Sequence, residues 1–117
     1  EIDRLMPKLA LLKSEEDFAA FRKAKSYSSE FLKIRVHFRS RQNSPRFGFV
    51  VSKKAVPKIH ERNKVKRILR ALVHSRLDDF DRDNDYIFQA RRDINHLSKA
   101  ELRDEFERLL KKRRRSL

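Results

Sequence analysis

The chemistry that stands out in this sequence is a concentration of positive charge between residues 53 and 70. Eight of these residues are lysine or arginine, and Glu61 is the only acid among them. Surface helices usually place acids one turn from bases, because opposite charges at that spacing relieve repulsion. Such relief is nearly absent here, so the run predicts a surface for an external polyanion, with nucleic-acid phosphate as the leading candidate. A solvated helix face is the alternative interpretation.

Asn63 lies inside this cationic run, within the sequence ERNKVKR. Its amide group can both donate and accept hydrogen bonds, whereas lysine and arginine side chains can only donate. Asn63 can therefore fix a phosphate, a ribose 2′-hydroxyl or a neighbouring backbone group. The alternative is that Asn63 only caps the start of a helix.

Groups that could carry catalysis are sparse. The chain has no cysteine, a single glycine, and four histidines that are far apart in the sequence. The acidic stretch DDFDRDND resembles the start of a calcium loop, but Tyr86 and Arg92 stand where such a loop needs glycine and glutamate. The sequence therefore predicts a solvated loop there, no metal site, and no catalytic residues in the protein itself.

A second candidate surface combines cations with aromatic rings. Lys33, Arg35 and His37 alternate with apolar residues and so share one face of a predicted strand. Phe18 and Phe21 lie about one turn apart in a predicted helix. Cations and aromatic rings around a groove are the features that bind single-stranded RNA. In the alternative interpretation, one or both phenylalanines belong to the core.

The composition also favours a nucleic-acid partner. The chain has 117 residues, which suits one domain with a modest core, and its 31 lysines and arginines against 17 acids give a formal net charge of +14. An anionic membrane surface is the second candidate partner. No apolar run approaches the roughly 20 residues that span a bilayer, so a transmembrane protein is not expected. The N-terminus lacks the features of a secretory signal. The absence of cysteine suits a reducing cytoplasm, where the protein is expected.

Hydrophobic periodicity predicts six elements that would position these residues. Helices are expected at about residues 15–25, around 61–77 and from 99 onward, and strands at 31–38, 46–54 and 86–92. The order α-β-β-α-β-α indicates an α+β fold, with helices packed on a small, mainly antiparallel sheet. Residues 1–112 are expected to form the single domain, followed by a mobile basic tail at 113–117.

The middle and last helices carry the most specific local patterns. In the middle helix, the apolar residues from Val65 to Leu77 follow helical spacing, and the basic residues gather on a separate flank. Arg76 falls in the apolar sector, so either the helix ends near it or its side chain reaches out to solvent. The last helix begins with a capping box formed by Ser98 and Glu101.

The run RFGFVVSKKAVPKIHERNKVKRILR resembles the signature of the bacterial ribonuclease P protein subunit, and the resemblance extends over about residues 9–112. That signature has an Arg-x-Gly strand ending in Ser-Lys-Lys, followed by an Arg-Asn helix. Lys64 replaces the usual arginine, Ala71 stands where glutamate is common, and the connection AVPKIHE lacks a frequent glycine. The matching residues are Arg46, Gly48, Ser52, Lys53, Lys54, Arg62, Asn63, Lys64, Lys66, Arg67 and Arg70.

This resemblance implies a fold and a function. The family's fold includes a left-handed β-α-β crossover, which is unusual among proteins. Its members join a large catalytic RNA and form the ribonuclease P holoenzyme, an endonuclease that removes the 5′ leader from precursor tRNA. The RNA carries the active site and holds the Mg²⁺ ions, so the protein alone is expected to be inactive. The protein binds the leader and helps to hold the fold of the catalytic RNA.

The resemblance also assigns roles to individual residues. The middle helix and the turn before it would face the catalytic RNA, and the groove between the first helix and the sheet would receive the single-stranded leader. The expected RNA-facing residues are Lys53, Lys54, Arg62, Asn63, Lys64, Lys66, Arg67 and Arg70. The expected leader-binding residues are Phe18, Phe21, Lys33, Arg35 and His37.

Two other functions remain open from the residues alone. One is a general RNA-binding or ribosomal-type protein without a role in tRNA processing. The other is a stand-alone, metal-dependent nuclease. A DNA-binding helix is disfavoured, because the chain has no heptad pattern from which a dimer could form.

Overall fold

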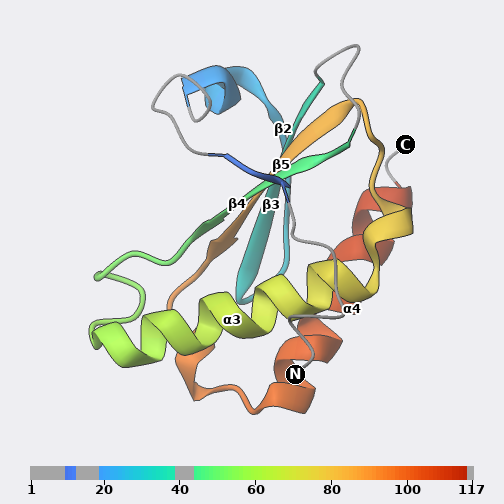
Figure 1. Cartoon of the computed structure of the whole chain (residues 1–117). Helices are drawn as coiled ribbons and strands as arrows, with labels where there is room; N and C mark the ends of the chain where they lie inside the picture. The colour runs from blue at the N-terminus through green and yellow to red at the C-terminus, as the bar shows by residue number, and fades with distance from the viewer. Residues whose placement is uncertain (1–9, 13–18, 39–43, 116–117) are drawn as a thin grey trace.

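The structure is a computed structural model that describes residues 10–12, 19–38 and 44–115. Two α-helices pack against a five-stranded sheet (Figure 1). The strands are β1 (Ala10–Leu11), β2 (Lys25–Ser28), β3 (Leu32–Phe38), β4 (Arg46–Val50) and β5 (Asn84–Ala90). The helices are α3 (Ile59–Ser75) and α4 (Lys99–Arg115), with short 3-10 turns η1 (Ala20–Lys23), η2 (Leu77–Asp79) and η3 (Ile94–His96).

The strand order across the sheet is β1-β4-β5-β3-β2. The β4–β5 and β1–β4 pairs are parallel, whereas the β3–β5 and β2–β3 pairs are antiparallel. The predicted α+β class is confirmed, but the sheet is evenly mixed rather than mainly antiparallel. Helix α3 connects β4 to its parallel neighbour β5, which is the β-α-β unit that the resemblance implies.

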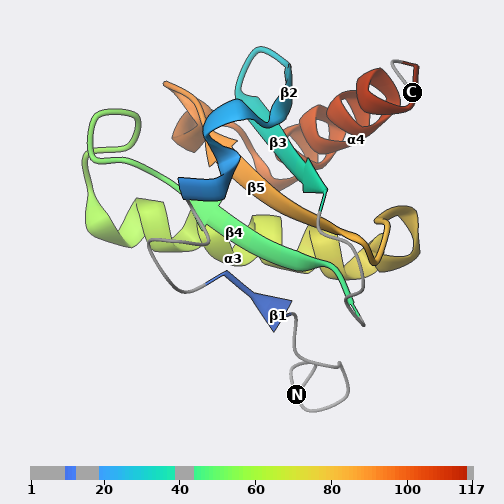
Figure 2. The ribbon, with the colours of Figure 1, turned by 90° about the horizontal axis from the view of Figure 1, so that it is seen from above.

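The two faces of the sheet are covered differently. In β3, Leu32 and Ile34 are fully buried and belong to the main core with residues of α3 and α4. Lys33, Arg35 and His37 point to the opposite face, as their alternation with apolar residues predicts. On that second face a smaller cluster forms around Phe21 of η1. Figure 2 shows the η1 segment over the side of the sheet that faces away from α3 and α4. The predicted leader-groove cations therefore share a face with the η1 segment.

Helix α3 packs as its periodicity predicts. Val65, Leu69 and Val73 are buried against the sheet, and each such side chain contributes roughly 1.5–3 kcal/mol of hydrophobic stabilisation. The helix ends at Ser75, so Arg76 lies just beyond it and forms ion pairs instead of entering the core. The first of the two alternatives for Arg76 is therefore confirmed.

Gly48 lies in the middle of β4 and is buried. Its strand neighbours Phe47 and Phe49 point toward α3, so a side chain at position 48 would project onto the other face. That face holds the cluster of Phe21 with Ile87, and Ile87 is the cross-strand partner of Gly48. Glycine at this position leaves space for Phe21 to approach the sheet.

The N-terminal part follows the prediction only in part. A helix over 15–25 was expected, and within the described part of that range Ala19 is α-helical and is followed by the 3-10 turn η1, but strand β2 begins at Lys25. Residues 25–28 pair with 33–36 of β3, and this pairing outweighs any local helical preference. Strand β1 has two residues, too few to produce a periodic pattern.

The C-terminal helix begins as predicted and continues into the segment that was expected to be a basic tail. The Ser98 hydroxyl accepts a bond of 3.1 Å from the Glu101 amide, and the Glu101 carboxylate accepts one of 2.8 Å from the Ser98 amide. Helix α4 continues to Arg115, three residues beyond the expected boundary at 112. Arg113, placed in a basic tail by the sequence, is buried, with its guanidinium carbon 5.2 Å from the Tyr86 ring centroid.

Candidate nucleic-acid interface

The exposed side of α3 and the turn before it form a cationic face, which we define as Lys53, Lys54, Asn63, Lys64, Arg67 and Arg70. All six residues are exposed, because the opposite side of the helix is the one packed on the sheet. Within the described ranges, none of the five cations forms an ion pair with a carboxylate. Their charge is therefore available to an external anion.

Arg70 is held in place by an aromatic ring. Its guanidinium carbon lies 5.7 Å from the centroid of Phe49 on β4. Phe49 in turn stacks on Phe88 of the central strand, with 5.9 Å between the ring centroids. A cation over the face of an aromatic ring is attracted by the ring quadrupole, so Arg70 is oriented without losing its charge.

Lys53 and Lys54 lie on the turn that follows β4. The Ser52 hydroxyl accepts a hydrogen bond of 3.1 Å from the Ala55 amide, and the Ser52 carbonyl accepts one of 2.9 Å from the Val56 amide. Val56 is fully buried and attaches the end of the turn to the core. The two lysines are thus presented to solvent by a turn that is fixed at both ends.

Two of the eight residues expected to face the catalytic RNA are less available than the others. Lys66 is half-buried, and so is Arg62. The Nη1 atom of Arg62 donates to the carbonyl oxygens of Val56 and Pro57, at 3.0 and 2.7 Å. This guanidinium group is therefore directed at the protein's own connection between β4 and α3. The sequence did not predict this role, because nothing in it distinguishes Arg62 from the other basic residues between positions 53 and 70.

Asn63 does not cap the helix. The N-cap residue of α3 is Lys58, and the helix begins at Ile59, four positions before Asn63. The capping alternative is therefore wrong, and Asn63 is an exposed residue in the second turn. Its amide is free of the N-cap role, which favours an external hydrogen-bonding partner for it.

Glu61, the only acid in the cationic run, is bound by another part of the chain. Its Oε2 atom accepts a hydrogen bond of 2.7 Å from the side-chain amide of Asn95 in η3. This hydrogen bond lowers the pKa of Glu61, with smaller contributions from nearby Lys58 and His60. The carboxylate ties the first turn of α3 to η3, and within the described ranges it forms no ion pair with a residue of the cationic face.

The second candidate surface is only partly as expected. Lys33, Arg35 and His37 are half-buried on the face that η1 covers. Phe21, expected to stack on a base, is only 2% exposed and packs with Leu12 and Ile87, with its ring centroid 5.6 Å from that of His37. Phe21 is therefore core, because its ring fills the space above the sheet. Phe18 lies outside the described residues.

Beside this surface is an ion pair that the sequence did not predict. Arg46 donates to both oxygens of the Asp85 carboxylate, at 3.1 and 2.7 Å, and Asp85 is only 1% exposed. Arg46 and Asp85 are direct partners in the parallel pairing of β4 with β5. The pair thus fixes the register of two central strands. The only sign of this ion pair in the sequence is that Asp85 directly precedes the apolar residues of β5.

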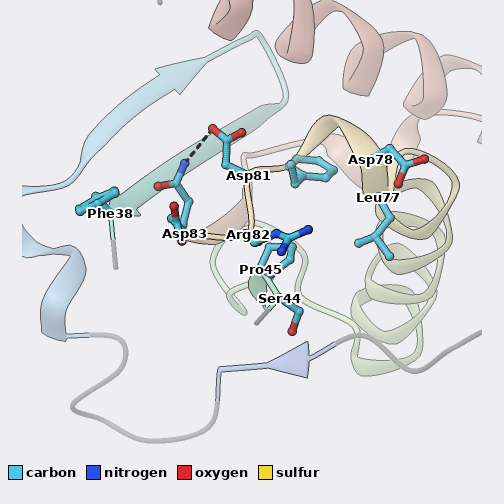
Figure 3. A pocket seen from close by; sticks show the side chains of 10 residues that line it. Phe38, Ser44, Pro45, Leu77, Asp78, Asp81, Arg82 and Asp83 are labelled. Carbon is cyan, nitrogen blue, oxygen red and sulfur yellow. Dashed lines mark hydrogen bonds between the residues drawn. The ribbon is translucent and has the colours of Figure 1, made fainter. Parts of the chain in front are cut away.

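The acidic loop forms a cavity of about 510 Å³ at the end of the sheet where β5 begins (Figure 3). Its lining includes Asp78, Asp81, Asp83 and the exposed ring of Phe38. Asp81 is fixed through its backbone amide, which donates 2.9 Å to the buried Tyr86 hydroxyl. Asp85, which would be a ligand in a calcium loop, is instead paired with Arg46.

Two further properties concern the described residues alone. They contain no group of three or more histidine, aspartate or glutamate side chains arranged to hold a metal ion. None of their helices is both long and apolar enough to cross a membrane.

Comparisons with known proteins agree in pointing to one family. A family model described as Ribonuclease P matches residues 6–114. The chain is 30% identical over 110 residues to the ribonuclease P protein component of Xanthomonas campestris pv. campestris, covering 93% of this chain and 72% of that protein. It is 33% identical over 102 residues to the ribonuclease P protein component of Clostridium kluyveri, covering 86% and 89% of the two chains.

Solved structures with the same fold include two bacterial proteins. The Staphylococcus aureus RNase P protein superposes with a TM-score of 0.80 at 24% identity, covering 89% of this chain and 94% of that one. The RNase P protein from Thermotoga maritima gives a TM-score of 0.74 at 21% identity, covering 89% and 96%. At these identities the likeness establishes the α+β fold.

Proposed function

This chain belongs to the ribonuclease P protein family, and we propose that its cationic face binds the catalytic RNA of that enzyme. The chain is a protein component of ribonuclease P with a role in tRNA processing, and hence a subunit of the holoenzyme. A general RNA-binding protein without that role is not favoured. The finer assignments that follow concern which surface meets which part of the RNA.

One observation carries the assignment of the cationic face. Lys53 of the turn, together with Lys64 and Arg67 of α3, is exposed and unpaired by described carboxylates, while the opposite side of α3 packs on the sheet. A rigid row of cations gains free energy on meeting phosphates, because each neutralised phosphate releases a condensed counterion. Asn63 adds a group that can both donate and accept beside those cations, which suits a 2′-hydroxyl or a base edge.

The protein contributes binding and positioning, and the bond cleavage belongs to the RNA. The cationic face repels a divalent cation, so the Mg²⁺ ions of the reaction are held by the RNA partner and not by this surface. Neutralising phosphates near those ions lets the RNA strands approach one another at lower Mg²⁺ concentration. The expected contribution of the protein is thus largest when Mg²⁺ is scarce.

The 5′ leader of precursor tRNA is assigned to the face of the sheet that carries Lys33, Arg35 and His37. Two of these residues are cations on adjacent outward positions of one strand, which suits an extended, single-stranded backbone. Phe21 supports the floor of this surface from within and does not stack on a base. A role in tRNA processing supports a cytoplasmic location for the protein, where tRNA precursors would be met.

Reconstitution tests the proposed function directly. A catalytic RNA of the ribonuclease P type is mixed with this chain at low Mg²⁺, and leader removal is compared with that by the RNA alone. Faster cleavage with the protein is expected, and equal rates would overturn the proposal. Purified protein that cut precursor tRNA by itself would favour the stand-alone nuclease, and equal affinity of the assembled complex for precursor and mature tRNA would exclude leader binding.

A further inference from the structure

The N-terminal end of α3 is connected to β4 by residues 51–58, and this connection carries Lys53 and Lys54. We infer that Arg62 is a positioning residue for these two lysines, rather than a direct contact to RNA. This inference rests on the proposed function, because it concerns how the cationic face is shaped. It distinguishes the basic residues of the cationic face, which meet phosphate, from Arg62, which sets the geometry of two of them.

The hydrogen bonds of Arg62 are the first observation. One nitrogen atom, Nη1, carries two hydrogens and donates to two consecutive carbonyl oxygens, those of Val56 and Pro57, at 3.0 and 2.7 Å. This uses the full donor capacity of that nitrogen. Because an arginine side chain is planar at its end, fixing Nη1 also fixes the orientation of the remaining donors.

The connection itself gives the second observation. Pro57 has no amide hydrogen, so the chain at that point cannot be held by its own N–H group. The hydrogen bonds from Ala55 and Val56 to Ser52 close the turn at the lysine end. The bonds from Arg62 close the helix end, and Val56, at 0% exposure, holds the connection to the core between them.

The contrast with Arg67 gives the third observation. Arg67 is exposed on the same helix, and its side chain is in none of the described hydrogen bonds or ion pairs. Arg62 is half-buried and directed at backbone carbonyls. If this half-buried arginine turned toward a phosphate it would give up both hydrogen bonds, and the loss of the partly buried one to the Val56 carbonyl is the costly part, because water can reach the exposed Pro57 carbonyl. Arg67 can bind a phosphate without giving up a described hydrogen bond.

A double-mutant cycle on the binding of catalytic RNA tests this inference. Arg62→Met keeps the stem of the side chain and removes the donors, and it is combined with the pair Lys53→Ala and Lys54→Ala. If Arg62 acts by placing the lysines, removing the lysines makes Arg62 redundant. The fold-loss of RNA affinity in the combined variant should then be smaller, by at least about threefold, than the product of the fold-losses in Arg62→Met and in the double lysine variant. A full product would overturn the inference.

Two matched variants sharpen the result. Arg67→Met, combined with the same lysine changes, should give the full product, since Arg67 and the lysines bind phosphate independently. Arg62→Lys keeps the charge on a shorter stem without the planar fork, so it should weaken binding as Arg62→Met does. Wild-type affinity in Arg62→Lys would instead identify a simple phosphate contact and overturn the inference.

Hydrogen exchange in the free protein separates this inference from the proposed function. Without RNA, Arg62→Met should speed exchange at the amides of Ala55 and Val56, while Arg67→Met should leave those rates unchanged. Unchanged exchange in Arg62→Met would overturn the positioning role even if the chain binds RNA. Faster exchange, together with lysine variants that bind RNA normally, would instead refute the assignment of the cationic face.

Discussion

The backbone amide of Phe31 donates a hydrogen bond of 2.6 Å to the carboxylate of Glu105, 74 residues further along the chain. The Ser29 hydroxyl donates to the same oxygen, and Arg108 donates to the other oxygen at 3.0 Å. Glu105 is only 2% exposed, although it lies on a helix with many charged residues. One buried carboxylate thus joins α4 to the turn between β2 and β3.

Removing this carboxylate should destabilise the protein. Glu105→Ala leaves the Phe31 amide without its acceptor in a partly buried site, whereas the Ser29 hydroxyl can still donate to the Leu32 carbonyl at 3.2 Å, so we expect a loss of about 2 kcal/mol in the free energy of unfolding. Urea denaturation followed by circular dichroism measures it. Asp104→Ala, at an exposed neighbouring position, is the control and should change stability by less than about 0.5 kcal/mol. Equal effects of the two changes would contradict this role of Glu105.

The same contacts predict a pH dependence. Burial by itself raises the pKa of Glu105, but the hydrogen bonds from Ser29, Phe31 and Arg108 together outweigh it and hold the pKa below the ordinary value of 4.5. A carboxyl whose pKa is lower in the folded state stabilises the fold above its unfolded pKa and loses that contribution as pH falls through its folded pKa. The stability difference between wild type and Glu105→Gln should therefore be constant near neutral pH and shrink below about pH 4.5. A difference that grew on acidification would show the opposite sign of the shift.

Arg46 and Asp85 allow a test of the central register. Arg46→Met removes the bidentate partner of a buried carboxylate, and the expected cost is about 3 kcal/mol or more. Changing both residues, Arg46→Met with Asp85→Asn, removes the buried charge as well and should recover part of this loss. Thermal unfolding of the three proteins measures the effect. A double variant no more stable than Arg46→Met would exclude the buried charge as the cause.

The cationic face should behave as a set of phosphate contacts. Arg67→Ala and Arg70→Ala should each weaken the affinity for the catalytic RNA by roughly tenfold and leave the fold intact. Each should also reduce the slope of log affinity against log salt by about one, because one fewer counterion is released. Filter binding over a range of salt concentrations provides both numbers. Arg103→Ala on the exposed side of α4 is the control; a loss of affinity as large as that of Arg67→Ala would show only general attraction.

Local patterns predicted the parts of this fold that local interactions determine. The alternation of Leu32, Ile34 and Val36 with polar residues identified β3, and the pairing of Ser98 with Glu101 identified the start of α4. Strand β2 was not predicted from the sequence. Tyr27 is extended through its pairing with Ile34, and no local pattern encodes that contact. Distant pairing also decides the parallel neighbours in the sheet, so the balance of strand directions was not predictable.

The charge of the candidate interface was predictable from the sequence, but the partners of individual cations were not. Lys64 and Arg67 are exposed as their positions on the helix predicted. Arg62, Arg46 and Arg113 look equally basic in the sequence, yet their guanidinium groups are directed respectively at two carbonyls, a buried carboxylate and a tyrosine ring. An arginine contacts the protein itself when folding brings a suitable acceptor or ring close to it. Those neighbours are distant in the sequence, so the sequence does not show which arginines have them.

The position of β5 at the centre of the sheet has a consequence for synthesis on the ribosome. β3 and β4 have no direct pairing with each other, and β5 joins the half of the sheet that contains β1 and β4 to the half that contains β3 and β2. Because β5 ends at Ala90, the two halves of the sheet cannot be joined until most of the chain has been translated. We therefore expect a nascent chain that stops before residue 84 to remain incompletely folded and sensitive to proteases. Helix α3 would already have been synthesised, but the sheet on which it packs would lack its central strand.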